Sequence, residues 1–545
     1  NGFRAPRPDS AGIFQFQIKA LHCADFYGRN EKTRNFAAGD IRICSFKIFL
    51  SRKKFDRSLF ALNRKLSVIL LVSFAAVSSF ADTVYWKGNN SDAGLGFYSE
   101  YGWDKMPSAS DDVVIDEAYI KTEGNGYLVD GFWNSDTTWN SLTLNYTNAN
   151  KKINSDANGP VQITITTDLK KLGGGYAKFS MGSAGTVFNL RVGGNVIVGA
   201  DENTAGGSLY LGNVTSYEDT KWGGPMDLVT VGGDVILYNN SKLFMNVYNR
   251  NGTSSYYDPD TYIGGSFLFR GSGYPSYQNP TLVLYNLDPA QAPHDTSSII
   301  SVESLSGSAT LMASSYSYSG SYRTDAILYL RSANNEKYIF DGWTYDISTG
   351  FGDTSKLKIV KDGVGTQVFS GTKLMFSGGV EVRSGTLVFD GRDTYAAQSH
   401  GKLTMLGGEL SIYSSATNPG GMGFSSMDYA GGTISLVIGN DSAGKIILTD
   451  GTINALDTME GYVEFNLTGN LALLEEGYQK IVDWTEKTSL TNSDFRANSY
   501  NSKEAVFDVR DDGLYVSYAA VPEPAAMAAV LGAMALAFAA LKRRN

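Results

Sequence analysis

A short unit built around two glycines recurs along this chain of 545 residues. It consists of an apolar residue, Gly-Gly, one variable residue and an apolar segment. Its regular copies are VGGNVIV at 192–198, VGGDVIL at 231–237 and IGGSFLF at 263–269, and its looser copies are GGVEV at 378–382, GGELSI at 407–412 and GGTISL at 431–436. The spacing varies while the segment after the glycines stays strand-like. This pattern is typical of a solenoid, in which strands stack and insertions fall in loops.

The glycine pairs are expected at corners between stacked strands. A backbone with positive φ suits glycine there, because glycine has no Cβ to clash. Alternating residues such as Val380 and Val382 would then point into a shared core. Other apolar runs, at 161–165, 235–238, 281–285 and 445–448, also have the pattern of strands. An all-β solenoid is therefore predicted for residues 82–518, and a β-sandwich array with glycine-rich hairpins remains an alternative.

Two adjacent segments resemble a known repeat. KDGVGTQVFSG at 361–371 and VEVRSGTLVF at 380–389 are similar to the autotransporter-associated β-strand repeat, although Lys373-Leu374-Met375-Phe376 stands where a Tyr-Thr-Gly segment is usual. The resemblance implies a right-handed parallel β-helix. Segments 102–104 and 111–115 look like the opening cap of such proteins, and segments 477–484 and 512–516 resemble their closing strands.

Charge is distributed unevenly along the chain. Residues 1–65 carry a net charge of +9 and the last residues add +3, so residues 66–541 have a net charge of -21 within a total of -9. Such an acidic body repels phosphate backbones, and a nucleic-acid partner is not expected. Both cysteines, Cys23 and Cys44, lie near the start, and only two histidines follow residue 81. Disulfides, thiolate zinc sites and three-histidine metal sites are thereby excluded from residues 82–545.

The region before residue 82 has the three parts of a secretory signal peptide. A basic Asn63-Arg64-Lys65 precedes the apolar LSVILLVSFAAV at 66–77, and the small residues of SSFA at 78–81 follow. Cleavage is predicted between Ala81 and Asp82, giving a signal at 62–81; a buried strand or core helix is the alternative. The chain begins with Asn1 and has no methionine before Met106. Residues 1–61 are therefore interpreted as an upstream leader of doubtful origin, either translated upstream sequence or the leader of a fragment.

The tail at 519–545 also has three parts. Val521-Pro522-Glu523-Pro524 precedes an uncharged, alanine-rich segment from Ala525 through Gly532 to Leu541, and Lys542-Arg543-Arg544 follows. Seventeen uncharged residues are at the lower limit for a single transmembrane helix, and the basic cluster would hold that end on the cytoplasmic side. A plain tail anchor is the simplest alternative.

This tail resembles the PEP-CTERM sorting signal of Gram-negative bacteria. The resemblance rests on Pro522, Glu523 and Pro524 as the motif, on Gly532 within the helix and on the basic cluster that follows. It implies processing by an exosortase, a membrane enzyme, and a transient membrane anchor before the protein reaches the cell surface or the extracellular space. Bearers of such tails are often tied to extracellular polysaccharide, which is thus a candidate partner.

No catalytic constellation stands out in the sequence. The acidic pairs Asp258 with Asp260 and Glu475 with Glu476 are interpreted as solvated loop acids, because catalytic carboxylates in a solenoid come from different coils. A calcium turn at 439–442 has too few acids. His294 and His400 are expected on surface loops. The tyrosines of 314–322 could stack on sugars, but a partly buried solenoid edge explains them more simply.

The sequence therefore predicts an exported structural or adhesive β-solenoid rather than an enzyme, with no cofactor. Its expected partners are the secretion translocon, an exosortase-like enzyme and an extracellular polysaccharide. The rival hypothesis is a polysaccharide-degrading β-helix enzyme, either a lyase or a glycosidase. An autotransporter adhesin is disfavoured, because a short helix rather than a run of membrane-barrel strands ends the sequence.

Overall fold

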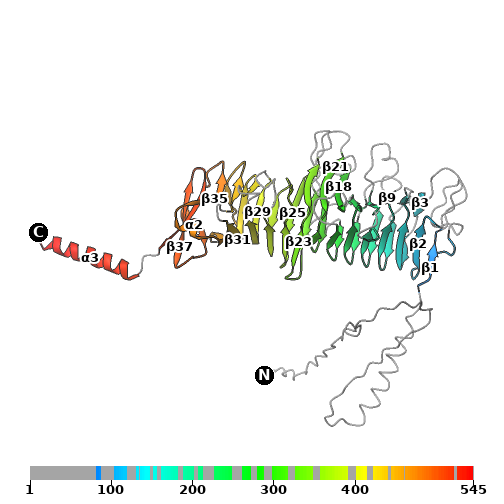
Figure 1. Cartoon of the computed structure of the whole chain (residues 1–545), viewed down its shortest axis with the longest axis horizontal. Helices are drawn as coiled ribbons and strands as arrows, with labels where there is room; N and C mark the ends of the chain where they lie inside the picture. Colours follow the sequence, from blue (N-terminus) through cyan, green and yellow to red (C-terminus); the bar gives the residue numbers. More distant parts are fainter. Residues whose placement is uncertain are drawn as a thin grey trace, which may run out of the picture. The chain divides into compact units, whose positions relative to one another are not determined.

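The structure is a computed structural model (Figure 1), and it describes the chain in segments. These are residues 81–86, 103–118, 130–133, 136–147, 151–155, 161–181, 188–201, 206–212, 226, 228–247, 261–271, 279–287, 298–316, 326–347, 356–390, 400–413, 421–439, 444–459, 461–520 and 524–543. The leader at 1–61 and residues 62–80 of the predicted signal lie outside the described residues.

The described body is mostly β-structure and is built from three parallel ladders. The first ladder contains β1 (Thr83–Tyr85), β2 (Asp112–Asp116), β5 (Ser141–Asn145), β8 (Leu169–Leu172), β11 (Val196–Val198), β14 (Val235–Tyr238), β17 (Phe267–Arg270), β20 (Leu305–Gly307), β23 (Lys337–Phe340), β26 (Thr366–Phe369), β28 (Thr386–Phe389), the later parts of β29 (Leu403–Tyr413) and β31 (Met427–Ile438), β34 (Val463–Gly469) and β36 (Phe495–Ala497).

The second ladder precedes the first within each coil. It contains β4 (Thr137–Trp139), β7 (Val161–Ile165), β10 (Phe188–Val192), β13 (Leu228–Val231), β16 (Thr261–Ile263), β19 (Ser298–Val302), β22 (Ala326–Leu330), β25 (Leu357–Lys361), β27 (Val380–Val382), the earlier parts of β29 and β31, and β33 (Ile453–Ala455).

The third ladder follows the first. It contains β3 (Asp130–Trp133), β6 (Lys151–Ser155), β9 (Tyr176–Met181), β12 (Ser208–Leu211), β15 (Lys242–Met245), β18 (Thr281–Leu287), β21 (Thr310–Tyr316) and β24 (Trp343–Ile347). At the next coil the Lys373-Leu374-Met375-Phe376 segment, which departs from the repeat, supplies only an isolated bridge from Leu374 to Thr344.

These ladders confirm the predicted all-β fold with long stacked parallel sheets, and Figure 1 shows the strands following one another in chain order. Strands stack in register, so that Val196 pairs with Val235, and Val235 with Phe267. These side chains are almost fully buried. Because side chains alternate across a strand, one row of each strand fills the core while the other row faces outward.

The two ends of the stack have different caps. At the first end Trp86 packs edge-on against Trp103, with ring centroids 4.7 Å apart, and Trp139 lies next to Trp103. The other end is closed by a sheet of β30 (Met422–Phe424), β32 (Ile446–Leu448), β35 (Gln479–Trp484), β38 (Gly513–Ala520) and β37 (Lys503–Arg510), with short helices α2 (Ala472–Glu475) and η4 (Asn492–Asp494) nearby in the chain. Strands β35, β38 and β37 pair antiparallel, which ends the parallel stacking.

The predicted role of the glycine pairs needs correction at the regular copies. None of the six glycines in the copies at 193–265 adopts a positive φ. Glycine is required at these positions because the coils stack closely. A Cβ on Gly232 would lie 2.2 Å from the carbonyl oxygen of Gly193, and a Cβ on Gly264 would lie 2.3 Å from the carbonyl oxygen of Gly232. Positive φ does occur at the second glycine of the looser copies, at Gly379 (+97°), Gly408 (+61°) and Gly432 (+95°).

The predicted transmembrane helix is not found. Among the described residues, no helix is long and apolar enough to cross a membrane. The segment forms helix α3 (Pro524–Lys542), which has 19 residues.

Candidate functional site

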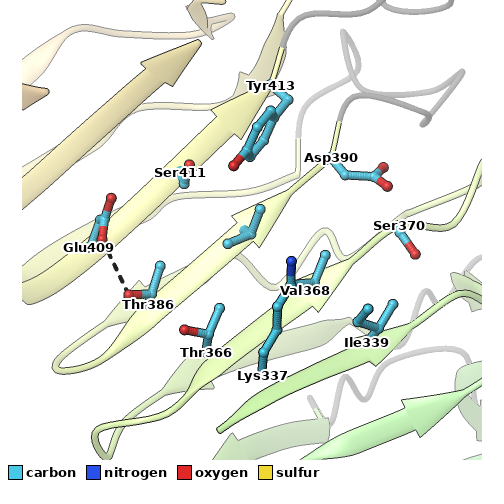
Figure 2. Close-up of a pocket in the computed structure, with 11 residues that line it drawn as sticks. Lys337, Ile339, Thr366, Val368, Ser370, Thr386, Asp390, Glu409, Ser411 and Tyr413 are labelled. Carbon is cyan, nitrogen blue, oxygen red and sulfur yellow. Dashed lines mark hydrogen bonds between the residues drawn. The ribbon is translucent and has the colours of Figure 1, made fainter. Parts of the chain in front are cut away.

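The outer face of the first ladder carries a groove of about 570 Å³ (Figure 2). It crosses four successive strands, β23, β26, β28 and β29. Its lining residues are Lys337, Ile339, Thr366, Val368, Ser370, Thr386, Val388, Asp390, Glu409, Ser411 and Tyr413.

Strand register brings these residues together from distant parts of the sequence. Lys337 pairs with Thr366 and Ile339 with Val368 across β23 and β26. Val368 then pairs with Val388, and Val388 with Ser411. All of these residues point outward, because the residues that alternate with them along the same strands, such as Phe369 and Phe389, are buried in the core.

The groove has an apolar floor and more exposed walls. Val368 and Val388 form the floor and are only 5% and 8% exposed. Ile339 on β23 is 45% exposed and Tyr413 on β29 is 40% exposed. An aliphatic side chain and an aromatic ring therefore project on opposite sides of a floor made by β26 and β28.

The pairing of β23 with the preceding strand of its ladder is irregular. Strand β20 pairs with β23 only between Gly307 and Phe340. The backbone of Leu305 is hydrogen-bonded instead by the side-chain amide of Gln367, two coils further on, which accepts from Leu305 N at 2.9 Å and donates to Leu305 O at 3.0 Å. This buried amide thus satisfies the Leu305 backbone, which β23 does not bond.

Polar groups line the two ends of the groove. Figure 2 shows Glu409 and Thr386 together at one end, Asp390 and Ser370 at the other, and Lys337 beside Val368 between them. The Glu409 carboxylate accepts hydrogen bonds from the Ser435 hydroxyl and from Thr386 Oγ1, the latter at 3.3 Å. The site thus combines one ammonium group, two carboxylates and several hydroxyls around an apolar floor.

A buried ion cluster lies on the second ladder of the same coils. Glu381 is 6% exposed and accepts from Lys358 Nζ and Arg383 Nε, each at 2.6 Å. Burial alone would raise the pKa of the Glu381 carboxyl, but its two basic partners outweigh that effect and hold the pKa below its ordinary value. Since both of its oxygens are already engaged, this cluster is a structural brace.

Two buried lysines lie where strands end in turns. Lys171 donates to the carbonyl oxygens of Tyr146, Leu172 and Gly173. Lys361 donates to those of Asp362 and Gly363, at 2.8 and 2.9 Å. Burial lowers the pKa of both ammonium groups to about 8, and nearby carboxylates oppose this only in part.

The described sorting residues lie near the first strand and in the last helix. Asp82, the predicted first residue after cleavage, directly precedes β1 and pairs with Lys105 at 2.6 Å, and Ala81 lies beside it. Pro524 begins α3, which contains Ala525, Gly532, Leu541 and Lys542, and Arg543 follows the helix. Val521, Pro522, Glu523 and Arg544 lie outside the described residues.

Other sequence candidates have mixed outcomes. His400 was expected on a surface loop, but it is buried, with 1% exposure. Its ring stacks on Phe376, with ring centroids 4.6 Å apart, and therefore packs among the aromatic side chains of the core. Glu475 forms an ion pair with Lys503 at 2.9 Å in the end cap. The acids at 258 and 260, His294, residues 317–322 of the tyrosine cluster and residues 440–442 of the calcium turn lie outside the described residues.

No protein-family model and no curated protein matches this chain. The groove was not predicted from the sequence. Its only sequence signal is the alternating outward positions of TQVFS at 366–370 (Thr, Val, Ser) and TLVFD at 386–390 (Thr, Val, Asp), which become a site only once the register is known.

Proposed function

We propose that this protein is an exported structural or adhesive component of the cell surface or extracellular matrix. The observation that carries the proposal is the continuous stack of parallel coils, closed by distinct caps at its two ends. Such a stack presents a long side-chain surface on a rigid scaffold. The coils are proposed to be right-handed, as crossovers between parallel strands almost always are.

The proposed route of export uses both ends of the sequence. The first strand, β1, begins at Thr83, one residue after the predicted mature start at Asp82. Removal of the signal would therefore leave the first ladder whole. At the other end, β38 finishes the cap at Ala520, and one residue, Val521, separates it from the Pro-Glu-Pro motif. Cleavage at that motif would likewise leave the body intact.

The tail is proposed to be a PEP-CTERM sorting signal processed by an exosortase. In this proposal α3 holds the precursor at the inner membrane through its apolar side chains, several of which are more than half exposed, such as Leu536 (73%) and Phe538 (74%). Lys542, Arg543 and Arg544 act as the retention cluster, and Pro522, Glu523 and Pro524 as the recognition motif.

Cell fractionation tests this proposal. The unaltered protein should be recovered at the cell surface or in the medium, and a version without residues 521–545 should lose surface retention. Glu523→Ala should accumulate as uncleaved precursor in the inner membrane, whereas the matched Glu504→Ala in the exposed cap strand β37 should be processed normally. Normal processing of Glu523→Ala would refute the role of the motif.

The rival function is polysaccharide degradation. It predicts that the purified protein releases reducing or unsaturated sugar ends from polysaccharides, whereas the structural role predicts binding without product. The proposed role is favoured because Glu409 in the groove is engaged by two hydroxyls from neighbouring strands. Product formation that is lost in Glu409→Gln would replace the structural proposal with the enzymatic one.

A further inference from the structure

The groove on the first ladder has the chemistry of a sugar-binding surface. Its apolar floor of Val368 and Val388 and the exposed ring of Tyr413 suit the flat C–H faces of sugar rings. The hydroxyls of Thr366, Thr386 and Ser411 and the nearby carboxylates suit the hydroxyl groups at the edges of those rings.

The dimensions of the groove fit an extended chain. From β23 to β29 there are three interstrand steps, or about 14 Å, with the two floor strands between the walls. Along the strands, positions 366 to 370 extend over about 13 Å. A short oligosaccharide segment therefore fits lengthwise on the floor, between Ile339 and Tyr413.

The charge of the groove selects against anionic chains. Lys337 is the single cationic residue of the lining, and Asp390 and Glu409 contribute two carboxylates near the two ends. The body around the groove is also acidic, with a net charge of -21 over residues 66–541. A polymer of uronic acids would bring further carboxylates beside these groups, which like-charge repulsion opposes.

We infer that this groove binds a segment of a neutral polysaccharide and discriminates against uronic-acid polymers. Tyr413 supplies the stacking ring, the two valines supply the floor, and the Asp390 carboxylate accepts hydrogen bonds from sugar hydroxyls, while Glu409 contributes its negative charge. Because the proposed export places the protein among extracellular glycans, the inference rests on the proposed function and names the partner class of this surface.

Affinity electrophoresis of the full chain tests the inference. Native gels would contain dextran, laminarin or galactomannan as neutral probes, or alginate as the uronic-acid probe. At least one neutral probe should retard the protein and alginate should not. Tyr413→Ala should weaken the retardation about tenfold, the equivalent of about 1.4 kcal/mol. Tyr238→Ala is the matched control. Tyr238 is the last residue of β14, as Tyr413 is the last residue of β29, and it lies on the same outer face but outside the groove.

A charge-removing variant tests the discrimination separately. Asp390→Asn combined with Glu409→Gln should gain measurable retardation in alginate, and its unfolding midpoint should match the unaltered protein. The inference is overturned if no neutral probe binds, if Tyr413→Ala binds as well as Tyr238→Ala, or if alginate binds the unaltered protein best. Export without glycan binding would refute only this inference, while glycan binding by a protein that never leaves the cell would refute only the proposed function.

Discussion

The regular glycine corners at 193–265 and the looser ones at 378–432 share a sequence pattern but differ in backbone geometry. In the regular corners Gly193, Gly232 and Gly264 stack directly on one another without positive φ. In the looser corners the second glycine, such as Gly432, adopts a left-handed φ. The same dipeptide thus meets two needs: close approach between coils in one region, and an unusual backbone conformation in the other.

The two regions also differ in how the corner is bonded. In the regular region, side chains form a chain of hydrogen bonds from coil to coil. Asp168 accepts from Asn195 N at 2.9 Å, Asn195 accepts from Asp234 N at 2.8 Å, and Asp234 accepts from Ser266 N at 2.8 Å. In each regular copy the residue after the glycine pair therefore donates its backbone N–H to a side chain of the preceding coil. In the looser region the corresponding residue belongs to a strand: Val380 begins β27, whereas Glu409 and Thr433 lie within β29 and β31.

Gly232→Ala gives the largest expected effect. The new Cβ would lie 2.2 Å from a backbone oxygen that cannot move without shifting the coil, so the free energy of unfolding should fall by about 3 kcal/mol. Gly431→Ala is the control, because its nearest neighbour would be Leu406 O at 3.6 Å. Urea denaturation should place this control within about 0.5 kcal/mol of the unaltered protein. Equal losses in the two variants would contradict the distinction between the two corners.

Gln367→Leu should have the next largest effect. It would leave the buried N–H and carbonyl of Leu305 without the amide that bonds them, and the free energy of unfolding should fall by about 2 kcal/mol. Gln162→Leu removes an exposed amide from β7 and should cost less than about 0.5 kcal/mol in the same urea experiment. If Gln367→Leu lowered the free energy of unfolding no more than this control, the Leu305 backbone would not need the Gln367 amide.

The buried lysine of the looser region predicts a pH dependence. The folded-state pKa of Lys361, about 8, is below its unfolded value of 10.5. The unfolded chain therefore binds more protons between these values, and the free energy of unfolding should rise with pH there. Lys171, whose pKa is also about 8, adds to this rise, and Lys361 contributes about 1 kcal/mol of it from pH 7 to 9. Lys361→Met should lose this increment, whereas Lys242→Met, an exposed control, should keep it. An unchanged pH slope in Lys361→Met would contradict the assignment.

Asn195→Ala tests the hydrogen-bonded corner and should have the smallest effect. It removes the acceptor for Asp234 N, but water can reach this half-buried position, so the expected cost is about 0.5 kcal/mol. Amide exchange of Asp234 should become faster, while that of Ser266, whose acceptor Asp234 is retained, should not change. Unchanged exchange at Asp234 would show that the corner hydrogen bond adds nothing.

Sequence patterns predicted the fold better than the site. Local alternation predicts strands such as Val161–Ile165 and Val235–Tyr238, which the structure confirms, because one row of each strand must be buried. Register between coils depends on the lengths of the intervening loops, and no pattern in one segment encodes it. Val368, Val388 and Tyr413 could therefore not be placed in one groove beforehand. His400 was misassigned for a related reason, since its burial depends on aromatic neighbours from other coils.

In the proposed route, the solenoid body is exported and released as a species that extends from Asp82 to the Pro-Glu-Pro motif. Intact-mass analysis and N-terminal sequencing of the protein recovered outside the cells test this claim most directly. We expect a species that begins at Asp82 and lacks helix α3. An N-terminus upstream of Asp82, or an extracellular species that still carries α3 and its basic cluster, would contradict it.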